Sequence, residues 1–491
     1  METIINELKN AQNVRSNLSK LRQLVRDSKE KELSLEELDH NNWMLPFLKS
    51  EDAKTRKNAA LLLGELECEN AKTALWEAYQ TEQTLFVKSA YLNALSHLDV
   101  EELVPELKEE ISVLMTGEVL PENQKHVNEQ VRELRKILIQ YEGITHHTFS
   151  ARNQTCEVLL LCNREQKGAV IHTITDGRAK LHPLGILVET SQLSAVMQNR
   201  LYRELVFPIH AGGLLPADAK SAAQKLWNSD MYELLERLHK ESGDFYFRIE
   251  CKSSMTLEER SAFSKKLSSE LERLSAGKLI NSTSDYEIEL RLIATKDGCF
   301  YPCMKLYTMK DKRFAYRKNA IAASIHPSTA ALIAELARPY LKENAQIMDP
   351  FCGVGTMLIE RDLCVPAREI YATDIFGEAI EKGRENAKLA GEKINFIHRD
   401  FFDFKHEYPF DEIITNMPLR GKKTKEETDQ FYADFFTKLP EILAKDAVII
   451  LYTNEIGFVK KQLRIHRNFC LLQEFCMQKK NEFYLMIIGT K

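Results

Sequence analysis

The sequence lacks the features that would place a protein in a membrane, in an oxidising compartment or around a metal ion. It contains no run of 18 apolar residues, which argues against a transmembrane helix and a membrane partner. Its ten cysteines are scattered without a Cys-x-x-Cys pair, so we expect reduced thiols, no bound metal and a cytoplasmic location. The first seven residues include two acids and do not resemble a signal peptide.

An excess of positive charge is also absent. Lysine and arginine number 67 against 72 acids, which gives a net charge of −5. Nucleic-acid-binding proteins usually carry a basic face, so any RNA contact in this chain must depend on local basic segments. The length of 491 residues predicts several domains, and a content of 44% hydrophobic and 28% charged residues is that of a globular protein.

The first part of the chain, residues 1–145, contains no convincing strand. Segments 56–66 and 88–98 repeat each other with leucines and small residues in register. Repeats at this spacing are typical of stacked helix pairs, so we predict a HEAT-like helical repeat domain, with an ordinary helical bundle as the alternative. Such an array would bind a protein partner or brace a neighbouring domain.

Residues 146–318 read as a mixed α and β region. Apolar and charged residues alternate along 286–292, which predicts a sheet with one face in water. We expect strands at 155–161, 168–173, 245–250 and 286–292, and helices at 191–205 and 257–274.

The most informative segment is Asp-Pro-Phe-Cys-Gly-Val-Gly-Thr at 349–356. It follows a short apolar run and precedes an apolar helical one, so a strand would lead through a turn into a helix. Gly353 and Gly355 would let a ligand approach the backbone. The segment has one Gly-x-Gly and no P-loop lysine, but Asp349 could accept a hydrogen bond from an ammonium group. This favours the zwitterionic end of S-adenosylmethionine over a phosphate.

Polar residues also follow the next three predicted strands, at Asp374, Asp400 and Asn416. Ligands bind at the carboxyl ends of parallel strands, where Asp374 would hold a ribose and Asp400 an adenine amino group. A single acid is more often a helix cap, but the ordered series after 349–356 favours a nucleoside cofactor. The predicted cofactor contacts are Asp349, Pro350, Phe351, Cys352, Gly353, Gly355, Thr356, Asp374, Ile375, Asp400 and Phe401.

With these motifs, residues 319–491 resemble a Rossmann-like class I methyltransferase. The segment 349–356 closely resembles the RNA guanine-N2 methyltransferases that carry a THUMP domain, which act on tRNA or large-subunit ribosomal RNA. Residues 146–318 resemble the THUMP module with its N-terminal extension. The resemblance implies three parts: helical HEAT-like repeats, an α+β THUMP-like region and an α/β catalytic domain. It also implies S-adenosylmethionine as cofactor and RNA as partner, tRNA before ribosomal RNA.

In this family the fourth strand ends in Asn or Asp, Pro, Pro and an aromatic residue. Here the tetrad is Asn416, Met417, Pro418 and Leu419, all four predicted as catalytic residues. The Asn416 oxygen and the next carbonyl can accept from an exocyclic amine and orient its lone pair. The missing aromatic would have stacked on a base, which is worth roughly 1–3 kcal/mol. Leu419 therefore leaves open a different substrate or a silent site.

Basic residues flank the predicted catalytic domain on both sides of its motifs. Basic and aromatic residues alternate before the domain, and a basic loop follows the tetrad, as suits RNA phosphates, although charged linkers look similar. The predicted RNA contacts are Lys312, Arg313, Arg317, Lys318, Arg420, Lys422 and Lys423.

Three functions are compatible with these motifs. The first is methyl transfer from S-adenosylmethionine to the N2 of a guanosine, in tRNA or otherwise in large-subunit ribosomal RNA. The second is adenine-N6 methylation by the same fold. The third is a catalytically weak or silent methyltransferase fold that binds RNA or assists ribosome assembly.

Overall fold

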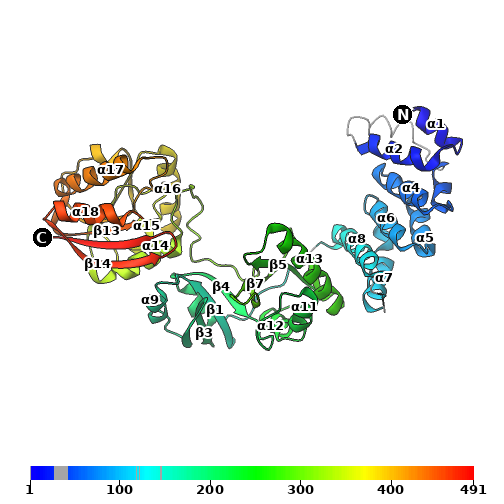
Figure 1. The fold of residues 1–491 in the computed structure, drawn as a ribbon, viewed down its shortest axis with the longest axis horizontal. Helices are drawn as coiled ribbons and strands as arrows, with labels where there is room; N and C mark the ends of the chain where they lie inside the picture. The colour runs from blue at the N-terminus through cyan, green and yellow to red at the C-terminus, as the bar shows by residue number, and fades with distance from the viewer. Residues whose placement is uncertain (1, 27–42, 118, 121, 144–145) are drawn as a thin grey trace.

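The chain forms three parts that lie in a row along its longest axis (Figure 1). We describe it from a computed structural model that covers residues 2–26, 43–117, 119–120, 122–143 and 146–491. The N-terminal helices lie at one end of the row and the C-terminal α/β part at the other (Figure 1). Within the described ranges, no helix has both the length and the apolar content to cross a bilayer.

The N-terminal part is helical wherever it is described. Helices α2, α4, α6 and α8 pack side by side in succession, while α1 packs on α2, α5 on α6 and α7 on α8. The helical content agrees with the sequence, and the HEAT-like assignment stays a prediction. The elements are α1 Glu2–Lys9, α2 Val14–Arg26, η2 Leu45–Lys49, α4 Ala53–Glu65, η3 Glu69–Ala71, α5 Lys72–Thr81, α6 Leu85–Leu95, η4 Glu101–Leu103, α7 Val104–Thr116 and α8 Gln124–Glu142.

The two repeated segments fall on α4 and α6, which are neighbours. A Cβ atom on Gly64 would lie 2.5 Å from the Cα of Ala94, so the glycine permits the close approach of these helices. Asp52 begins α4 by accepting a hydrogen bond from the Thr55 N–H at 3.0 Å. The small residues of the repeat therefore serve helix packing.

The middle part contains one eight-stranded sheet with the order β2-β3-β1-β4-β8-β7-β5-β6. The predicted helix 257–274 is confirmed as α13, and three of the four predicted strands are confirmed with shifted ends. The elements are β1 Cys156–Cys162, α9 Lys167–His172, β2 Arg178–His182, β3 Gly185–Thr190, α10 Leu193–Gln198, β4 Tyr202–Pro208, α11 Ala219–Trp227, α12 Met231–Leu238, β5 Phe245–Lys252, α13 Leu257–Leu274, β6 Leu279–Asn281, β7 Ile288–Ala294 and β8 Phe300–Leu306.

Two predictions for the middle part are wrong. The expected strand 168–173 is helix α9, because short apolar runs do not distinguish a strand from a buried helix. The expected helix 191–205 divides into α10 and β4. Strand β4 pairs with β1 and β8, so partners distant in the sequence override the local helical pattern.

The expected water-exposed face of β7 is also wrong. The side chains of Glu289 and Arg291 are buried, with 1% and 5% exposure. Arg291 donates to Glu289 and to Glu204, and Arg248 donates to Glu289 at 2.6 Å. Buried charges persist when each is paired and hydrogen-bonded. Burial raises the pKa of Glu204, but Arg291 and Lys305 outweigh it and lower that pKa to about 2.

The C-terminal part is a seven-stranded sheet with the order β11-β10-β9-β12-β13-β15-β14, flanked by helices. Strands β9 to β13 are parallel, and β15 is antiparallel to both neighbours. The elements are α14 Pro327–Ala337, η5 Arg338–Tyr340, β9 Gln346–Asp349, α15 Thr356–Cys364, β10 Glu369–Asp374, α16 Gly377–Ala390, β11 Asn395–His398, η6 Phe401–Asp403, β12 Phe410–Asn416, α17 Lys425–Lys438, η7 Leu439–Glu441, β13 Leu443–Thr453, α18 Ile456–Ile465, β14 Phe469–Gln478 and β15 Phe483–Thr490.

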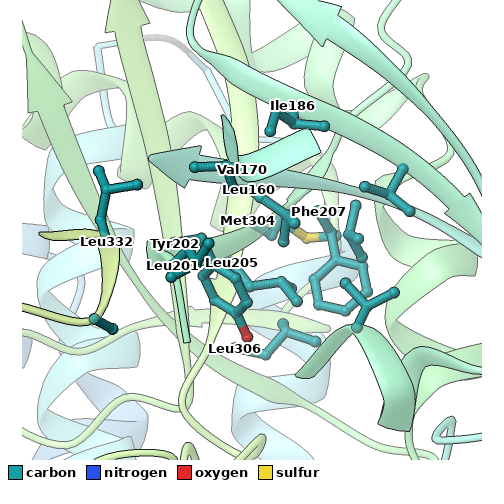
Figure 2. Close-up of a cluster of buried hydrophobic side chains, with 14 of the residues drawn as sticks. Leu160, Val170, Ile186, Leu201, Tyr202, Leu205, Phe207, Met304, Leu306 and Leu332 are labelled. Carbon is teal, nitrogen blue, oxygen red and sulfur yellow. The ribbon is translucent and has the colours of Figure 1, made fainter. Parts of the chain in front are cut away.

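One apolar cluster joins the middle and C-terminal parts. Figure 2 shows Leu332 of α14 beside residues at the start of β4, including Leu201 and Tyr202, and all three belong to the same buried cluster. At this junction Arg200 donates two hydrogen bonds to Glu360 on α15, at 2.8 and 2.7 Å. The middle part therefore packs against the C-terminal domain through apolar contacts and a partly buried ion pair.

Candidate active site

The glycine-bearing turn between β9 and α15 is shaped by its backbone. Gly353 and Gly355 have φ values of 52° and 76°, a region that side chains rarely allow. A Cβ atom on Gly355 would also lie 2.8 Å from the ring of Phe396. The Cys352 N–H donates to the carbonyl of Thr373 on β10 at 3.0 Å. These constraints keep the turn open and fix it to the neighbouring strand.

Two acids at adjacent strand ends meet under this turn. Asp374 accepts hydrogen bonds from the N–H groups of Gly353 and Phe376, each at 2.9 Å. Asp349 is 1% exposed and accepts from the Phe351 N–H at 3.0 Å. Burial, only partly offset by hydrogen bonds, raises the pKa of Asp349 to about 7. A buried carboxyl of this kind, with no cation beside it in the described structure, is suited to a positively charged ligand.

The surroundings of the turn fit S-adenosylmethionine. The Thr356 hydroxyl, at the start of α15, is buried without a hydrogen-bond partner among the described residues. Ile375 and Phe376, directly after Asp374, are 57% and 64% exposed. Large exposed apolar side chains at a strand end can cover a nucleobase. Phe376 was missed from the sequence, although its position next to Asp374 was a usable signal.

The two residues after β11 differ in exposure. Asp400 is exposed and accepts a hydrogen bond from the Phe402 N–H at 3.0 Å, so it begins the short helix η6. The ring of Phe401 is buried and packs 5.7 Å from the rings of Phe351 and Phe435. Asp400 stays a predicted adenine contact. The Phe401 side chain belongs to the core, which leaves its backbone as the group that can meet a ligand.

The tetrad begins at the end of β12, the strand beside β9. Asn416 is partly exposed, and its amide makes no hydrogen bond with another described residue. Met417 is buried, and its N–H donates to the carbonyl of Tyr452 at 3.0 Å. Pro418 and Leu419 are exposed. The structure therefore brings a free amide and a fixed backbone to the same sheet edge as Asp349.

The basic loop after the tetrad is folded as a turn. Arg420 donates through its Nε to the carbonyl of Lys423 at 3.0 Å, and Lys423 lies 4.6 Å above the ring of Phe431. Lys422 is exposed at its tip. These three predicted RNA contacts border the strand end that carries Asn416.

The second predicted group of RNA contacts needs a correction at Arg313. This guanidinium is 8% exposed, because it donates to Asp311 and to the carbonyls of Asn199 and Tyr202. It anchors the linker, the segment between β8 and α14, to the middle part and is not free for RNA. Arg317 is half-buried and donates to the carbonyl of Ile325 at 3.2 Å. The remaining predicted contacts, Lys312 and Lys318, are exposed.

Sequence reasoning also missed the side chains that hold the linker against the domain. The backbone N–H of Asn319 donates to the side-chain oxygen of Asn386 on α16. The side-chain nitrogen of Asn386 donates to the carbonyls of Asn319 and of Val354, which lies in the glycine turn. Tyr316 donates to Glu360 at 2.6 Å, next to Arg200. Burial and the Glu360 charge raise the pKa of Tyr316 well above its ordinary value. Nothing local marks these residues, because their partners are distant in sequence.

Comparison with known proteins agrees with this geometry. Residues 315–469 match the model of a family described as the RMKL-like methyltransferase domain. The chain is 28% identical over 131 residues to a tRNA (guanine(10)-N2)-dimethyltransferase of Methanothermobacter thermautotrophicus. The aligned region covers 26% of this chain and 38% of that protein. It is 27% identical over 156 residues to a release factor glutamine methyltransferase of Bacillus cereus, which covers 27% of this chain and 54% of that protein. The chain thus spans about half or less of the length of these relatives.

Solved structures extend the likeness of the fold beyond the catalytic domain. TrmN from Thermus thermophilus superimposes with a TM-score of 0.51 at 18% identity, over 68% of this chain and 99% of TrmN. A methyltransferase solved in complex with SAH, SMU.472, gives a TM-score of 0.50 at 14% identity, over 68% and 98%.

The C-terminal part is therefore a class I methyltransferase domain. S-adenosylmethionine, the cofactor expected from the sequence, is the cofactor of this class, and the turn, Asp349 and the exposed side chains after Asp374 fit it.

Proposed function

We propose that the protein methylates the exocyclic N2 of a guanosine in RNA, with tRNA as the favoured substrate. The supporting observation is the free amide of Asn416 at the end of β12, next to the strand that carries Asp349. The similarity to a tRNA (guanine(10)-N2)-dimethyltransferase supports the same assignment.

The proposed chemistry needs positioning more than proton transfer. When bound, S-adenosylmethionine supplies the methyl group. The Asn416 side-chain oxygen and the Met417 carbonyl would accept from the two N–H bonds of the guanine amine and turn its lone pair toward the methyl carbon. The methylated amine would release its extra proton to water. Leu419, which is 55% exposed, would cover the base by apolar contact alone.

A basic pocket on the middle part supports an RNA substrate. It has a volume of about 450 Å³ and lies between α10, β4 and the linker. Its acids, Glu204 and Asp311, are paired with Arg291 and Arg313. The exposed cations in its lining have no ion-pair partner among the described residues; they are Arg152, Arg203, Lys310 and Lys312. The pocket therefore carries an excess of positive charge, as phosphate contacts require.

His326 of the catalytic domain lies close enough to Arg203, which lines the pocket, to be affected by its charge. This histidine begins α14 by accepting from the Ser328 N–H at 3.2 Å. Burial, together with the charges of Arg203 and Arg317, lowers the pKa of His326 to about 4. RNA held in the pocket would thus lie beside the helix that follows the linker.

A second candidate is methylation of a protein amide. It is favoured by the similarity to release factor glutamine methyltransferases, and a glutamine amide also presents N–H bonds that Asn416 could accept. The basic pocket of the middle part favours RNA over this candidate.

The test is methyl transfer from tritiated S-adenosylmethionine to three separate acceptors: unmodified tRNA transcripts, ribosomal RNA and release factor. Label in tRNA that digests to N2-methylguanosine supports the proposal, and Asn416→Ala should lower the rate by about 10²–10³-fold, as loss of a transition-state contact does. Label in release factor alone would move the assignment to the amide. Cofactor binding without transfer to any acceptor would favour the silent alternative.

A further inference from the structure

The N-terminal helices carry a groove that the active site does not use. It lies across α2 and α4, with Phe86 of α6 at one side, and has a volume of about 930 Å³. Apart from Phe86 and the charged residues, most of the residues that line the groove carry hydroxyl or amide groups. The charged residues of the lining are Arg15, Lys20, Lys54 and Lys57. Among the described residues of this lining, four cations and no acid thus share one concave surface.

This positive charge contrasts with the domain that carries it. Residues 1–145 contain 18 lysines and arginines against 26 acids, a net charge of −8. Asp52 is the acid beside Arg15, but it caps α4 and accepts from the Thr55 N–H and hydroxyl. Hydrogen bonds from Thr55, and to a smaller extent the charge of Arg15, lower the pKa of Asp52. The Asp52 carboxylate therefore stays charged but is engaged by Thr55, so it does not neutralise the cations of the groove.

The groove cations are available to a ligand. Within the part of the chain that the structure describes, Arg15, Lys20 and Lys54 have no ion-pair partner, and all three are exposed. The Lys57 ammonium lies 5.8 Å from the ring of Phe86, which is partly exposed. A cation beside an accessible ring suits a phosphate next to a base or a sugar.

Its chemistry and position fit RNA better than a protein. Stable protein interfaces have an apolar centre, whereas Phe86 and Val14 are the large apolar side chains of this lining. Figure 1 shows α2 and the methyltransferase domain at opposite ends of the molecule. A ligand that reaches both must be long and negatively charged along its length, which describes folded RNA.

We propose that the groove between α2 and α4 binds the phosphate backbone of the RNA substrate, at a distance from the methylated base. This inference rests on the proposed function, since it assumes that the acceptor is RNA. The helical domain would add affinity through phosphate contacts and leave the choice of nucleotide to the catalytic end.

The test compares two fourfold glutamine variants of the full chain. One neutralises the groove and the other removes equal charge from exposed positions elsewhere in the same domain. Binding of an unmodified tRNA transcript is measured by fluorescence anisotropy between 50 and 200 mM salt, about the range where phosphate contacts weaken. The groove variant is Arg15→Gln, Lys20→Gln, Lys54→Gln and Lys57→Gln, and the control is Lys49→Gln, Lys108→Gln, Lys125→Gln and Arg132→Gln.

We expect the groove variant to bind the transcript at least about tenfold more weakly. The slope of log affinity against log salt concentration should become shallower, by an amount that corresponds to the loss of about three to four phosphate contacts. The control should bind within about twofold of wild type. Circular dichroism verifies that both variants keep their helices. Equal affinity and equal salt slope for the two variants would overturn the proposal, as would competition by polyglutamate at the same charge concentration as RNA.

The readout also separates this inference from the proposed function. Transcript binding can be measured without methyl transfer. If the protein methylates no RNA but the groove variant binds the transcript more weakly, the groove proposal is supported and the proposed function is contradicted. If the protein methylates tRNA and the groove variant has unchanged affinity and KM for tRNA, the proposed function is supported and the groove proposal is contradicted.

Discussion

Two buried carboxylates of the methyltransferase domain, Glu360 and Asp349, are close in sequence but opposite in surroundings. Glu360 is 1% exposed and accepts from Arg200 and Tyr316, which belong to the middle part and the linker. Asp349 is equally buried, but it accepts from the Phe351 N–H and has no cation beside it among the described residues. A buried charge with a cationic partner supports the structure, whereas one without such a partner is held ready for a ligand. We therefore propose that Glu360 is a structural acid and that Asp349 is a ligand-binding acid.

The largest effect is expected where the paired acid is removed. Glu360→Ala would leave Arg200 and Tyr316 without their acceptor at the junction of two parts, which should lower the free energy of unfolding by about 3–5 kcal/mol. Urea denaturation followed by circular dichroism measures it. Glu335→Ala, which removes the exposed Arg338 pair on the same domain, is the control and should cost about 1 kcal/mol or less. Equal losses in the two variants would break the comparison.

A smaller loss, in binding rather than folding, is expected at the unpaired acid. Asp349→Asn should weaken S-adenosylmethionine by about 1.5–3 kcal/mol, because a hydrogen bond to a charged group is lost. Calorimetric titration of the purified protein measures it. Unchanged cofactor affinity together with lower stability would make Asp349 a structural residue like Glu360.

The pH dependence sharpens the same contrast. Because the pKa of Asp349 in the folded protein is about 7, above its ordinary 3.8, the folded state holds a proton that the unfolded state has lost. Its contribution to stability is thus present at pH 4 and lost as the pH rises through about 7. Relative to Asp349→Asn, the cofactor-free wild type should lose stability between pH 5 and about 8. Thermal unfolding of both proteins across this range provides the measurement.

The same ionisation should make cofactor binding depend on pH. An ammonium ligand favours the charged carboxylate, so the rise in melting temperature caused by the cofactor should be greater at pH 8 than at about pH 6. The Asp349→Asn protein should show little difference between the two. A cofactor shift that grows toward low pH would contradict this role of Asp349.

The smallest expected effect is a gain at Leu419. Leu419→Tyr would restore a ring at the last position of the tetrad, and stacking on a base is worth roughly 1–3 kcal/mol. With tRNA as acceptor, KM should fall while cofactor affinity stays constant. Leu419→Met, which keeps an apolar chain of similar size, is the matched control. No difference between tyrosine and methionine would indicate that the base does not meet this residue.

The catalytic fold was predictable because its signal is local. The strand, turn and helix around 349–356 are contiguous, and Gly353 and Gly355 occupy backbone conformations that few other residues adopt. The middle part was less predictable. The local pattern predicts a helix where β4 forms, because the partners of β4, strands β1 and β8, lie far away in the sequence. The charged face of β7 is buried with its ion pairs, which the alternation of apolar and charged residues does not reveal.

Short motifs and residue types are sufficient to predict the methyltransferase class, the cofactor and the order of polar residues at the strand ends. Which charges are free depends instead on the folded arrangement of the chain. Arg313 looks like Lys312 in the sequence, yet it is buried against Tyr202 while Lys312 is exposed. Asp349 and Glu360 likewise differ through Arg200, which lies 160 residues before Glu360. Burial and pairing are sums over distant neighbours, and only folding brings those neighbours together.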